Sequence, residues 1–171
     1  MTSNDLTAWG VDPALGFPAL AAVHPRMTPQ LVRFESGLGT LPERLETLLA
    51  DVELKAGQLC SECPPGLVMV ERPVGRHPTP HLGYATGVIM VGLHRALRDR
   101  FNFPVSIVQI STGEWKKATT GRGNATKDEV MAWAVEAWPA LEGCSQDEAD
   151  AVAIATMAWE SVEGMESSEA A

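Results

Sequence analysis

The sequence predicts a single α/β domain. Five short segments have the apolar or alternating pattern of β-strands, and longer segments with helical spacing of apolar residues follow the third strand and the later ones. With 171 residues, 45% of them hydrophobic, the chain is long enough for one domain with a proper core. We therefore expect a central five-stranded mixed sheet flanked by helices over residues 1–163, followed by a disordered tail over residues 164–171.

The first three expected strands follow one another closely and form an antiparallel meander. Residues 6–12 are a short apolar run that ends in Asp12, and residues 18–23 are a second run after the turn residue Gly16. In residues 30–35 apolar and polar side chains alternate, as in a half-exposed strand. Aspartate before proline is commonly a turn former, so Asp12 alone does not indicate a site.

A helix and a buried strand are expected next. Leucine and valine recur at helical spacing over residues 41–54, after the N-cap candidate Thr40. Residues 67–70 are continuously apolar, which is typical of a strand covered on both faces, and Glu71 ends this strand. An ion pair with Arg72 is the alternative to a site role for Glu71.

Three cysteines provide no disulfide framework. Cys60 and Cys63 form a C-x-x-C pair in a stretch that we interpret as a polar, proline-flanked loop. No second C-x-x-C pair or closely spaced histidine pair completes a zinc site, so reduced thiols are favoured over structural zinc. Cys144 is interpreted as a small residue near the start of a helix.

The next segments predict a loop, a helix, a strand and another helix. Proline and glycine mark residues 74–81 as a loop, and residues 82–97 form a helix rich in small residues. Gly83 and Gly87 in this helix would permit close packing against the sheet or against another subunit. Residues 103–110 alternate as a fifth strand, and residues 126–138 have helical spacing.

A basic segment follows the fifth strand. Within residues 115–127, Lys116, Lys117, Arg122 and Lys127 surround a glycine pair, and no acid in that range offsets them. We interpret this segment as a local anion-binding surface. The formal net charge of -9 argues against a general nucleic-acid coat, but it is compatible with a nuclease whose metal site concentrates acids.

Two carboxylates mark the start of the last expected helix. Ser145 and Glu148 fit a capping box, which places Asp147 in the first helical turn and Asp150 three residues later. Residues three apart on a helix are neighbours. Both carboxylates are therefore expected on one helix face.

Together, these two segments resemble the RuvC family of Holliday-junction resolvases, especially its short phage-type members. The shared pattern is Lys-Lys-x-x-x-Gly-x-Gly-x-Ala-x-Lys-x-x-Val, followed by Asp-x-Ala-Asp-Ala-x-Ala-Ile-Ala. Upstream, the residues from Gly10 to Pro13 match the family's Gly-x-Asp-Pro-Gly context, although Ala14 replaces the last glycine. Glu71 matches the acid that closes the family's fourth strand. The resemblance implies a ribonuclease H-like fold and a structure-selective DNA endonuclease.

The resemblance also implies the site and its cofactor. Oxygen ligands of this kind suit Mg²⁺, with Mn²⁺ able to substitute, and two ions per site would promote phosphodiester hydrolysis that leaves 5′-phosphate ends. The implied catalytic residues and metal ligands are Asp12, Glu71, Asp147 and Asp150. The expected DNA-binding residues are Lys116, Lys117, Arg122 and Lys127, together with Arg76 in the loop of residues 74–81.

The expected partners are branched DNA, with a four-way junction as the main substrate, and a second copy of the chain in a homodimer. Two alternatives stay open: a nuclease for other branched or replicating DNA, and a nonenzymatic relative that binds DNA structures. No apolar run approaches the length of a membrane span, and residues 1–5 lack the features of a signal peptide. We therefore expect a cytoplasmic protein without a nucleotide cofactor.

Overall fold

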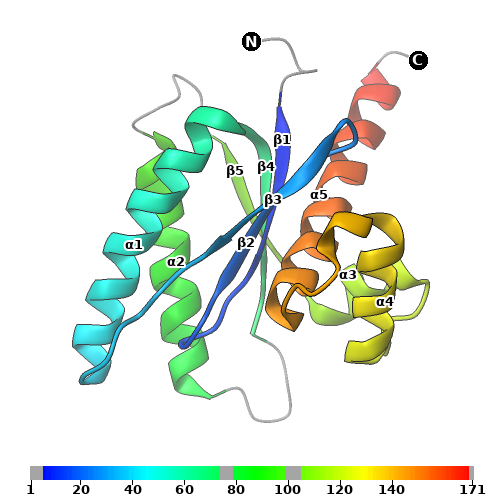
Figure 1. Ribbon diagram of the computed structural model, residues 1–171. Coiled ribbons are helices and arrows are strands. Elements are labelled where there is room, and N and C mark those ends of the chain that lie inside the picture. Colours follow the sequence, from blue (N-terminus) through cyan, green and yellow to red (C-terminus); the bar gives the residue numbers. More distant parts are fainter. Residues whose placement is uncertain (1–5, 74–78, 99–104, 170–171) are drawn as a thin grey trace.

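The computed structural model describes residues 6–73, 79–98 and 105–169, with side chains described up to residue 163 (Figure 1). No helix in these ranges is both long enough and apolar enough to cross a membrane. The strands are β1 (Thr7–Asp12), β2 (Ala19–His24), β3 (Met27–Arg33), β4 (Pro65–Glu71) and β5 (Ser106–Ile110). The helices are α1 (Leu41–Glu62), α2 (Pro80–Arg98), α3 (Thr112–Thr120), α4 (Lys127–Ala137) and α5 (Gln146–Glu169), with a short 3₁₀ helix, η2 (Pro139–Leu141).

The five strands form one mixed sheet, as the sequence predicts, and the structure gives their order as β3-β2-β1-β4-β5. The pairs β1–β2 and β2–β3 are antiparallel, whereas β1–β4 and β4–β5 are parallel. The carboxyl ends of β1, β4 and β5 therefore meet at one edge of the sheet. Asp12 and Glu71 are the last residues of β1 and β4, so this edge brings both acids together.

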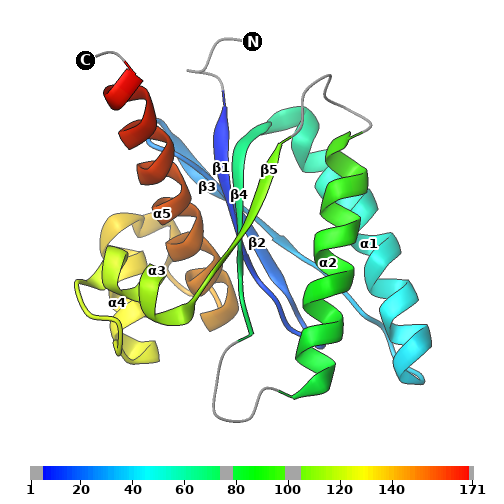
Figure 2. The same cartoon turned by 180° about the vertical axis from the view of Figure 1, so that it is seen from behind.

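Helices cover both faces of the sheet (Figures 1 and 2). On one face, α1 and α2 enclose a core that includes Trp9, Leu48 and Ile89. On the other face, α5 packs along β1 and β2, and α3 and α4 pack beside it. Successive side chains of β1 therefore point to opposite faces of the sheet: Trp9 packs in the core with α1 and α2, and Ala8 packs in the core under α5.

The predicted loop around the C-x-x-C pair is wrong. Helix α1 continues to Glu62, so Cys60 lies in its last turn and Cys63 forms its C-cap, and both thiols are buried. Ala56 and Leu59 continue the apolar face of the helix, which explains the extra turns. Burial raises the pKa of the Cys63 thiol above its ordinary value.

Two glycines of α2 do not pack as expected within the chain. A Cβ added to Gly83 or Gly87 would meet nothing within 4 Å, so neither residue permits close packing against the sheet. Gly92 of α2 does permit close packing, but against α1, because an added Cβ would meet the side chain of Val52 in α1 at 2.7 Å. The surface of α2 at Gly83 and Gly87 is therefore not covered by other described parts of the chain.

Helix α5 continues to Glu169, so residues 164–169 are helical where the sequence analysis expects a disordered tail. The division of the chain at residue 163 stays a prediction.

Candidate active site

The backbone of α5 determines where Asp12 points. A Cβ added to Gly10 would fall inside the van der Waals radii of backbone atoms of Ala151 and Ala155, so α5 lies directly on this part of β1. Side chains two residues apart in a strand share a face. Asp12 therefore faces the first turns of α5, where it is half-buried.

Glu71 reaches the same side of the sheet from β4. Met69, two residues earlier, packs in the core under α5 together with Ile154, so alternation turns Glu71 toward α5 as well. At the beginning of α3, the hydroxyl of Thr112 donates a short hydrogen bond to Glu71 Oε1. This contact orients the carboxylate.

The first turn of α5 supplies the other two acids. The predicted capping box is present, because Ser145 N donates to Glu148 Oε2 at 2.8 Å and Glu148 N donates to Ser145 Oγ at 3.3 Å. Asp147 and Asp150 follow in this turn and are half-buried. Gln146 Nε2 donates to Asp150 Oδ1 at 2.7 Å, which fixes that carboxylate.

The electrostatics link the four acids to one another. Burial, followed by the negative charges of Glu71, Asp150 and Asp147, raises the pKa of Asp12 well above its ordinary value. Burial also raises the pKa of Asp150 to about 6, and Glu71 contributes to this rise. The structure therefore brings all four sequence-predicted acids into one electrostatic environment.

The donor chemistry of this group fits a hard divalent cation. The four predicted ligands are all carboxylates, which hard cations prefer. Burial and the negative charges of the other acids raise the pKa of Asp12, and a bound cation would relieve the repulsion among these charges. In the described ranges, however, no three Asp, Glu, His or Cys side chains are close enough together to form a ready-made ligand set. The fit is thus one of charge and donor type.

Two of the predicted DNA-binding lysines lie near the acids. The positive charges of Lys116 and Lys127 lower the pKa of Asp150, which places both lysines beside α5. Lys116 Nζ also donates to the carbonyl oxygen of Ala125 at 2.8 Å, so its position is fixed by the loop that precedes α4. Lys127 is exposed at the first position of α4.

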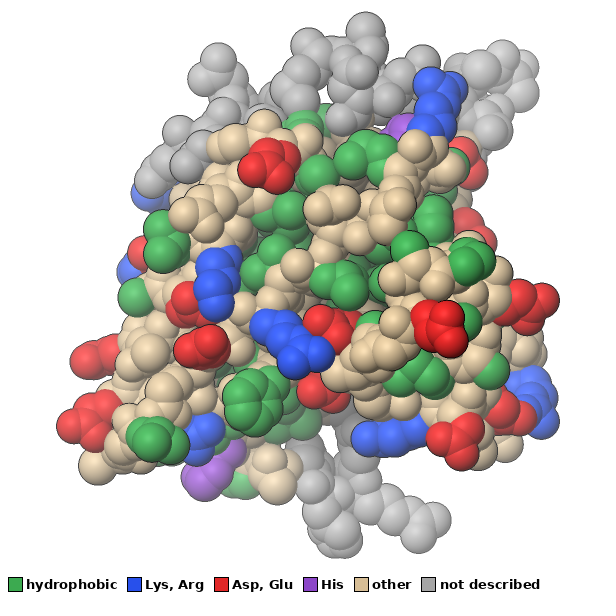
Figure 3. Space-filling view, viewed as in Figure 1, with side chains coloured by type: hydrophobic (Ala, Val, Ile, Leu, Met, Phe, Trp, Pro, Cys, Tyr) green, Lys and Arg blue, Asp and Glu red, His purple; other side chains and the backbone are tan. Residues whose placement is uncertain are grey.

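The rest of the basic segment is less available than the sequence indicates. Arg122 forms a short ion pair with Glu129 in α4, so an acid outside the segment offsets its charge. Lys117 is exposed on α3. Arg76 lies outside the described residues. Figure 3 shows acidic and basic side chains interspersed on the face viewed, without a continuous basic surface among the described residues.

Sequence reasoning missed three residues that support the acids. Thr112 and Gln146 bind two of the carboxylates, and Arg33 at the end of β3 binds Glu148 between Asp147 and Asp150. No local pattern marks Thr112 or Arg33, because their partners lie far away in the sequence. Gln146 is four residues before Asp150 in the same helix, so helical spacing and the capping box were the two available signals.

Comparison with known proteins gives consistent matches along most of the chain. The chain is 30% identical over 152 residues to the crossover junction endodeoxyribonuclease RuvC of Rickettsia felis, covering 85% of this chain and 92% of that protein. It is 29% identical to the protein of the same name from Acidiphilium cryptum, covering 85% of this chain and 86% of that one. No protein-family model matches the chain.

Solved structures support the same fold. Thermus thermophilus RuvC in complex with a Holliday junction substrate superposes with a TM-score of 0.68 at 21% identity, covering 88% of this chain and 90% of that one. The yeast mitochondrial Holliday junction resolvase Ydc2 superposes with a TM-score of 0.55 at 14% identity, covering 88% of this chain and 78% of that one. At these identities, the structural likeness establishes the ribonuclease H-like fold alone.

Proposed function

Because this chain belongs to the RuvC family of crossover junction endodeoxyribonucleases, we propose that it cuts four-way DNA junctions by metal-dependent phosphodiester hydrolysis. The proposed catalytic residues are Asp12, Glu71, Asp147 and Asp150. The observation that carries the proposal is the arrangement of the elements: Asp12 and Glu71 end the neighbouring parallel strands β1 and β4, and α5, which contains the other two acids, lies directly on β1. Burial and the charges of the three other acids raise the pKa of Asp12, which is consistent with this arrangement. These residues come from three separate elements, and the fold gathers their charges at one edge of the sheet.

We propose that the four carboxylates hold Mg²⁺, or Mn²⁺ in its place, with two ions per site. When bound there, the metal supplies an activated water and neutralises charge on the scissile phosphate. Thr112 keeps the Glu71 carboxylate in one orientation, and Gln146 does the same for Asp150. Both acids are thereby preorganised before a cation arrives.

The lysines supply the phosphate contacts that the acids cannot. Lys116 and Lys127 are near enough to Asp150 to lower its pKa, so a phosphate held by them lies next to the carboxylates. Lys117 is proposed to hold the strand farther from the cut. The ion pair of Arg122 with Glu129 must open or be shared before Arg122 can contribute, so we assign it a smaller share of the affinity.

We propose that the active form is a homodimer with α2 at its interface. Tyr84 and Val91 are large side chains that are 53% and 46% exposed on this helix. The open glycines Gly83 and Gly87 lie on the same helix and would allow a second backbone to approach closely. A dimer would have two active sites, so it could cut two strands of the same four-way junction.

The test is cleavage of a synthetic four-way junction in Mg²⁺, compared with linear duplex and with a three-way fork of the same sequence. We expect paired nicks in the junction, little cutting of the duplex, and loss of both nicks in Asp147→Asn. Equal cutting of fork and junction would favour a nuclease for other branched DNA. Tight junction binding without cleavage in Mg²⁺ or Mn²⁺ would leave a nonenzymatic DNA-binding protein.

A further inference from the structure

An exposed aromatic side chain lies in the loop that follows Asp12, in a part of the chain that the proposed function does not use. The side chain of Phe17, in the loop that joins β1 to β2, is 69% exposed. Asp12 and Ala19, which flank this loop, lie directly opposite each other in the ladder. Because Phe17 is two residues from Ala19, its Cα lies within about 12 Å of the Cα of Asp12.

The part of β2 that follows Phe17 faces the side of the sheet that carries the acids. Ala19, Ala21 and Val23 all pack in the core formed with α5. Before Ala19 the chain stays paired with β3, since Phe34 N donates to the carbonyl oxygen of Pro18 at 2.9 Å. Ala19, two residues after Phe17, pairs with Asp12, and directly paired residues of a ladder share a face of the sheet. Phe17 therefore immediately precedes the strand residues that lie beside Asp12.

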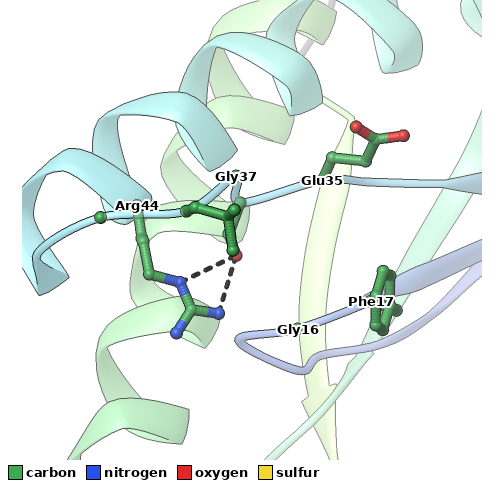
Figure 4. A pocket seen from close by; sticks show the side chains of 8 residues that line it. Gly16, Phe17, Glu35, Gly37 and Arg44 are labelled. Atoms are coloured by element: carbon green, nitrogen blue, oxygen red, sulfur yellow. Dashed lines mark hydrogen bonds between the residues drawn. The ribbon is translucent and has the colours of Figure 1, made fainter.

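Phe17 borders a pocket of about 460 Å³ between the β1–β2 loop and the loop that leads from β3 into α1 (Figure 4). Arg44 of α1 ties the two loops together, because its Nη2 donates to the carbonyl oxygen of Leu15 and to Ser36 Oγ, both at 3.0 Å. Ser36 Oγ also donates to the Leu15 carbonyl oxygen. These bonds give the pocket a fixed shape before a ligand enters.

The lining suits a flat, apolar ligand better than a phosphate. Leu38, on the pocket wall, is 98% exposed, and two of the three Arg44 guanidinium nitrogens are engaged with the protein. Glu35 also lines the pocket, but its carboxylate points away from Phe17 in Figure 4. A pocket of this volume accepts a small planar group, and an exposed aromatic ring stacks on any nucleobase.

We propose that Phe17 and this pocket hold one unstacked base of the DNA strand that is cut at the four acids. This inference rests on the proposed function, because the base reaches the pocket only when its strand lies at the acids. The ring provides the stacking surface, and the two loops tied by Arg44 keep the base beside the scissile phosphate. The lysines near Asp150 then hold the strand from the α3 and α4 side, and Phe17 holds it from the β2 side.

The experiment uses four-way junctions that carry 2-aminopurine at single positions around the mapped cut, bound to the full chain in Ca²⁺. We expect the wild type to change the fluorescence at one position near the cut. Phe17→Ala should abolish that change, weaken junction binding about tenfold and slow cleavage in Mg²⁺, whereas Phe17→Trp should retain all three properties. Leu38→Ala is the matched control, because it removes an exposed apolar side chain from the same pocket without removing a stacking surface.

The controls separate the possible failures. Thermal unfolding of Phe17→Ala should match that of the wild type, since the ring is mostly in water. If Phe17→Ala binds junctions, changes the fluorescence and cleaves as the wild type does, the inference is wrong, while the proposed nuclease function still stands. A change of molar mass in Phe17→Ala, measured by light scattering, would instead assign the ring to an interface between copies. A wild type that neither binds nor cuts junctions would refute the proposed function itself.

Discussion

Arg33, at the end of β3, forms a bidentate ion pair with Glu148 in the first turn of α5. Its Nε donates to Oε1 at 2.8 Å and its Nη2 donates to Oε2 at 2.7 Å. Arg33 pairs with Ala19, and Ala19 pairs with Asp12, so all three share one row across the sheet. Glu148 therefore ties the start of α5 to the row that contains Asp12. Together with the close approach of α5 to Gly10, this ion pair helps to hold the acids of α5 near the acid of β1.

The pH dependence of stability tests the ion pair. The hydrogen bond from Arg33 is the main cause that holds the pKa of Glu148 at about 2, below its ordinary value of 4.5. A lowered pKa stabilises the fold above about pH 4.5, and this contribution is lost as the pH falls toward 2. Urea unfolding should therefore show a gap between wild type and Glu148→Gln at pH 6 that narrows toward pH 2. A gap that does not change with pH would contradict this account.

Asp150→Asn should stabilise the protein while removing its activity. Burial raises the pKa of Asp150 from 3.8 to about 6, so the folded state disfavours the charged carboxylate. This penalty is absent below about pH 4, grows as the pH rises to 6 and stays constant above that. At pH 7, without divalent metal, Asp150→Asn should be more stable by on the order of 2 kcal/mol in denaturant unfolding.

The same measurement at pH 4 provides the control, because the two proteins should then unfold together. Binding of Mn²⁺ to the wild type should weaken as the pH drops below about 6, because protons then compete with the cation for Asp150. An Asp150→Asn variant that is less stable than the wild type at pH 7 would contradict the burial of a charged group at this position.

Thr112→Val removes the hydroxyl that donates to Glu71 and keeps the side-chain shape. Supporting hydrogen bonds of this kind typically change metal affinity or activity by about 10–100-fold. We expect a single-turnover cleavage rate at least about tenfold below the wild type, and near-normal cleavage in Thr112→Ser. Equal cleavage rates in Thr112→Val and the wild type would show that catalysis does not depend on the hydrogen bond from Thr112 to Glu71.

Gly10→Ala tests how closely α5 must approach β1. An added Cβ would overlap backbone atoms of α5, and backbone cannot move aside as a flexible side chain does. We expect a loss of about 3 kcal/mol or more in urea unfolding, together with loss of cleavage. Gly16→Ala is the matched control, because its Cβ would meet nothing within 4 Å and its stability should stay within about 0.5 kcal/mol of the wild type.

The sequence predicted the five strands because their apolar patterns are local, and it predicted Asp12 and Glu71 as strand ends for the same reason. The capping box at Ser145 was predicted because its two residues are three positions apart. The ion pair of Arg33 with Glu148 was missed, because its partners are 115 residues apart and nothing local indicates their contact.

The errors also have physical causes. Pro64 and Pro65 indicated a loop around Cys60, yet the apolar face of α1 continues past Ala56 and keeps the chain helical until Glu62. The spacing of Gly83 and Gly87 indicated close packing against the sheet or against another subunit, and the first alternative is wrong, because larger residues such as Ile89 and Leu93 decide which face α2 turns to the core. Packing against another subunit stays a prediction. Local patterns indicated the five strands and most of the helices, but not α3, which occupies the start of the predicted basic segment. The contacts between elements could be known only from the fold.

The most direct test of the four-acid site is calorimetric titration of the protein with Mn²⁺ at pH 7.5. The account predicts saturable binding that weakens at least about tenfold in each of Asp12→Asn, Glu71→Gln, Asp147→Asn and Asp150→Asn. Glu142→Gln, which removes an exposed acid shortly before α5, should bind Mn²⁺ as the wild type does. Wild-type affinity in any of the four variants would remove that residue from the site, and wild-type affinity in all four would contradict the central claim.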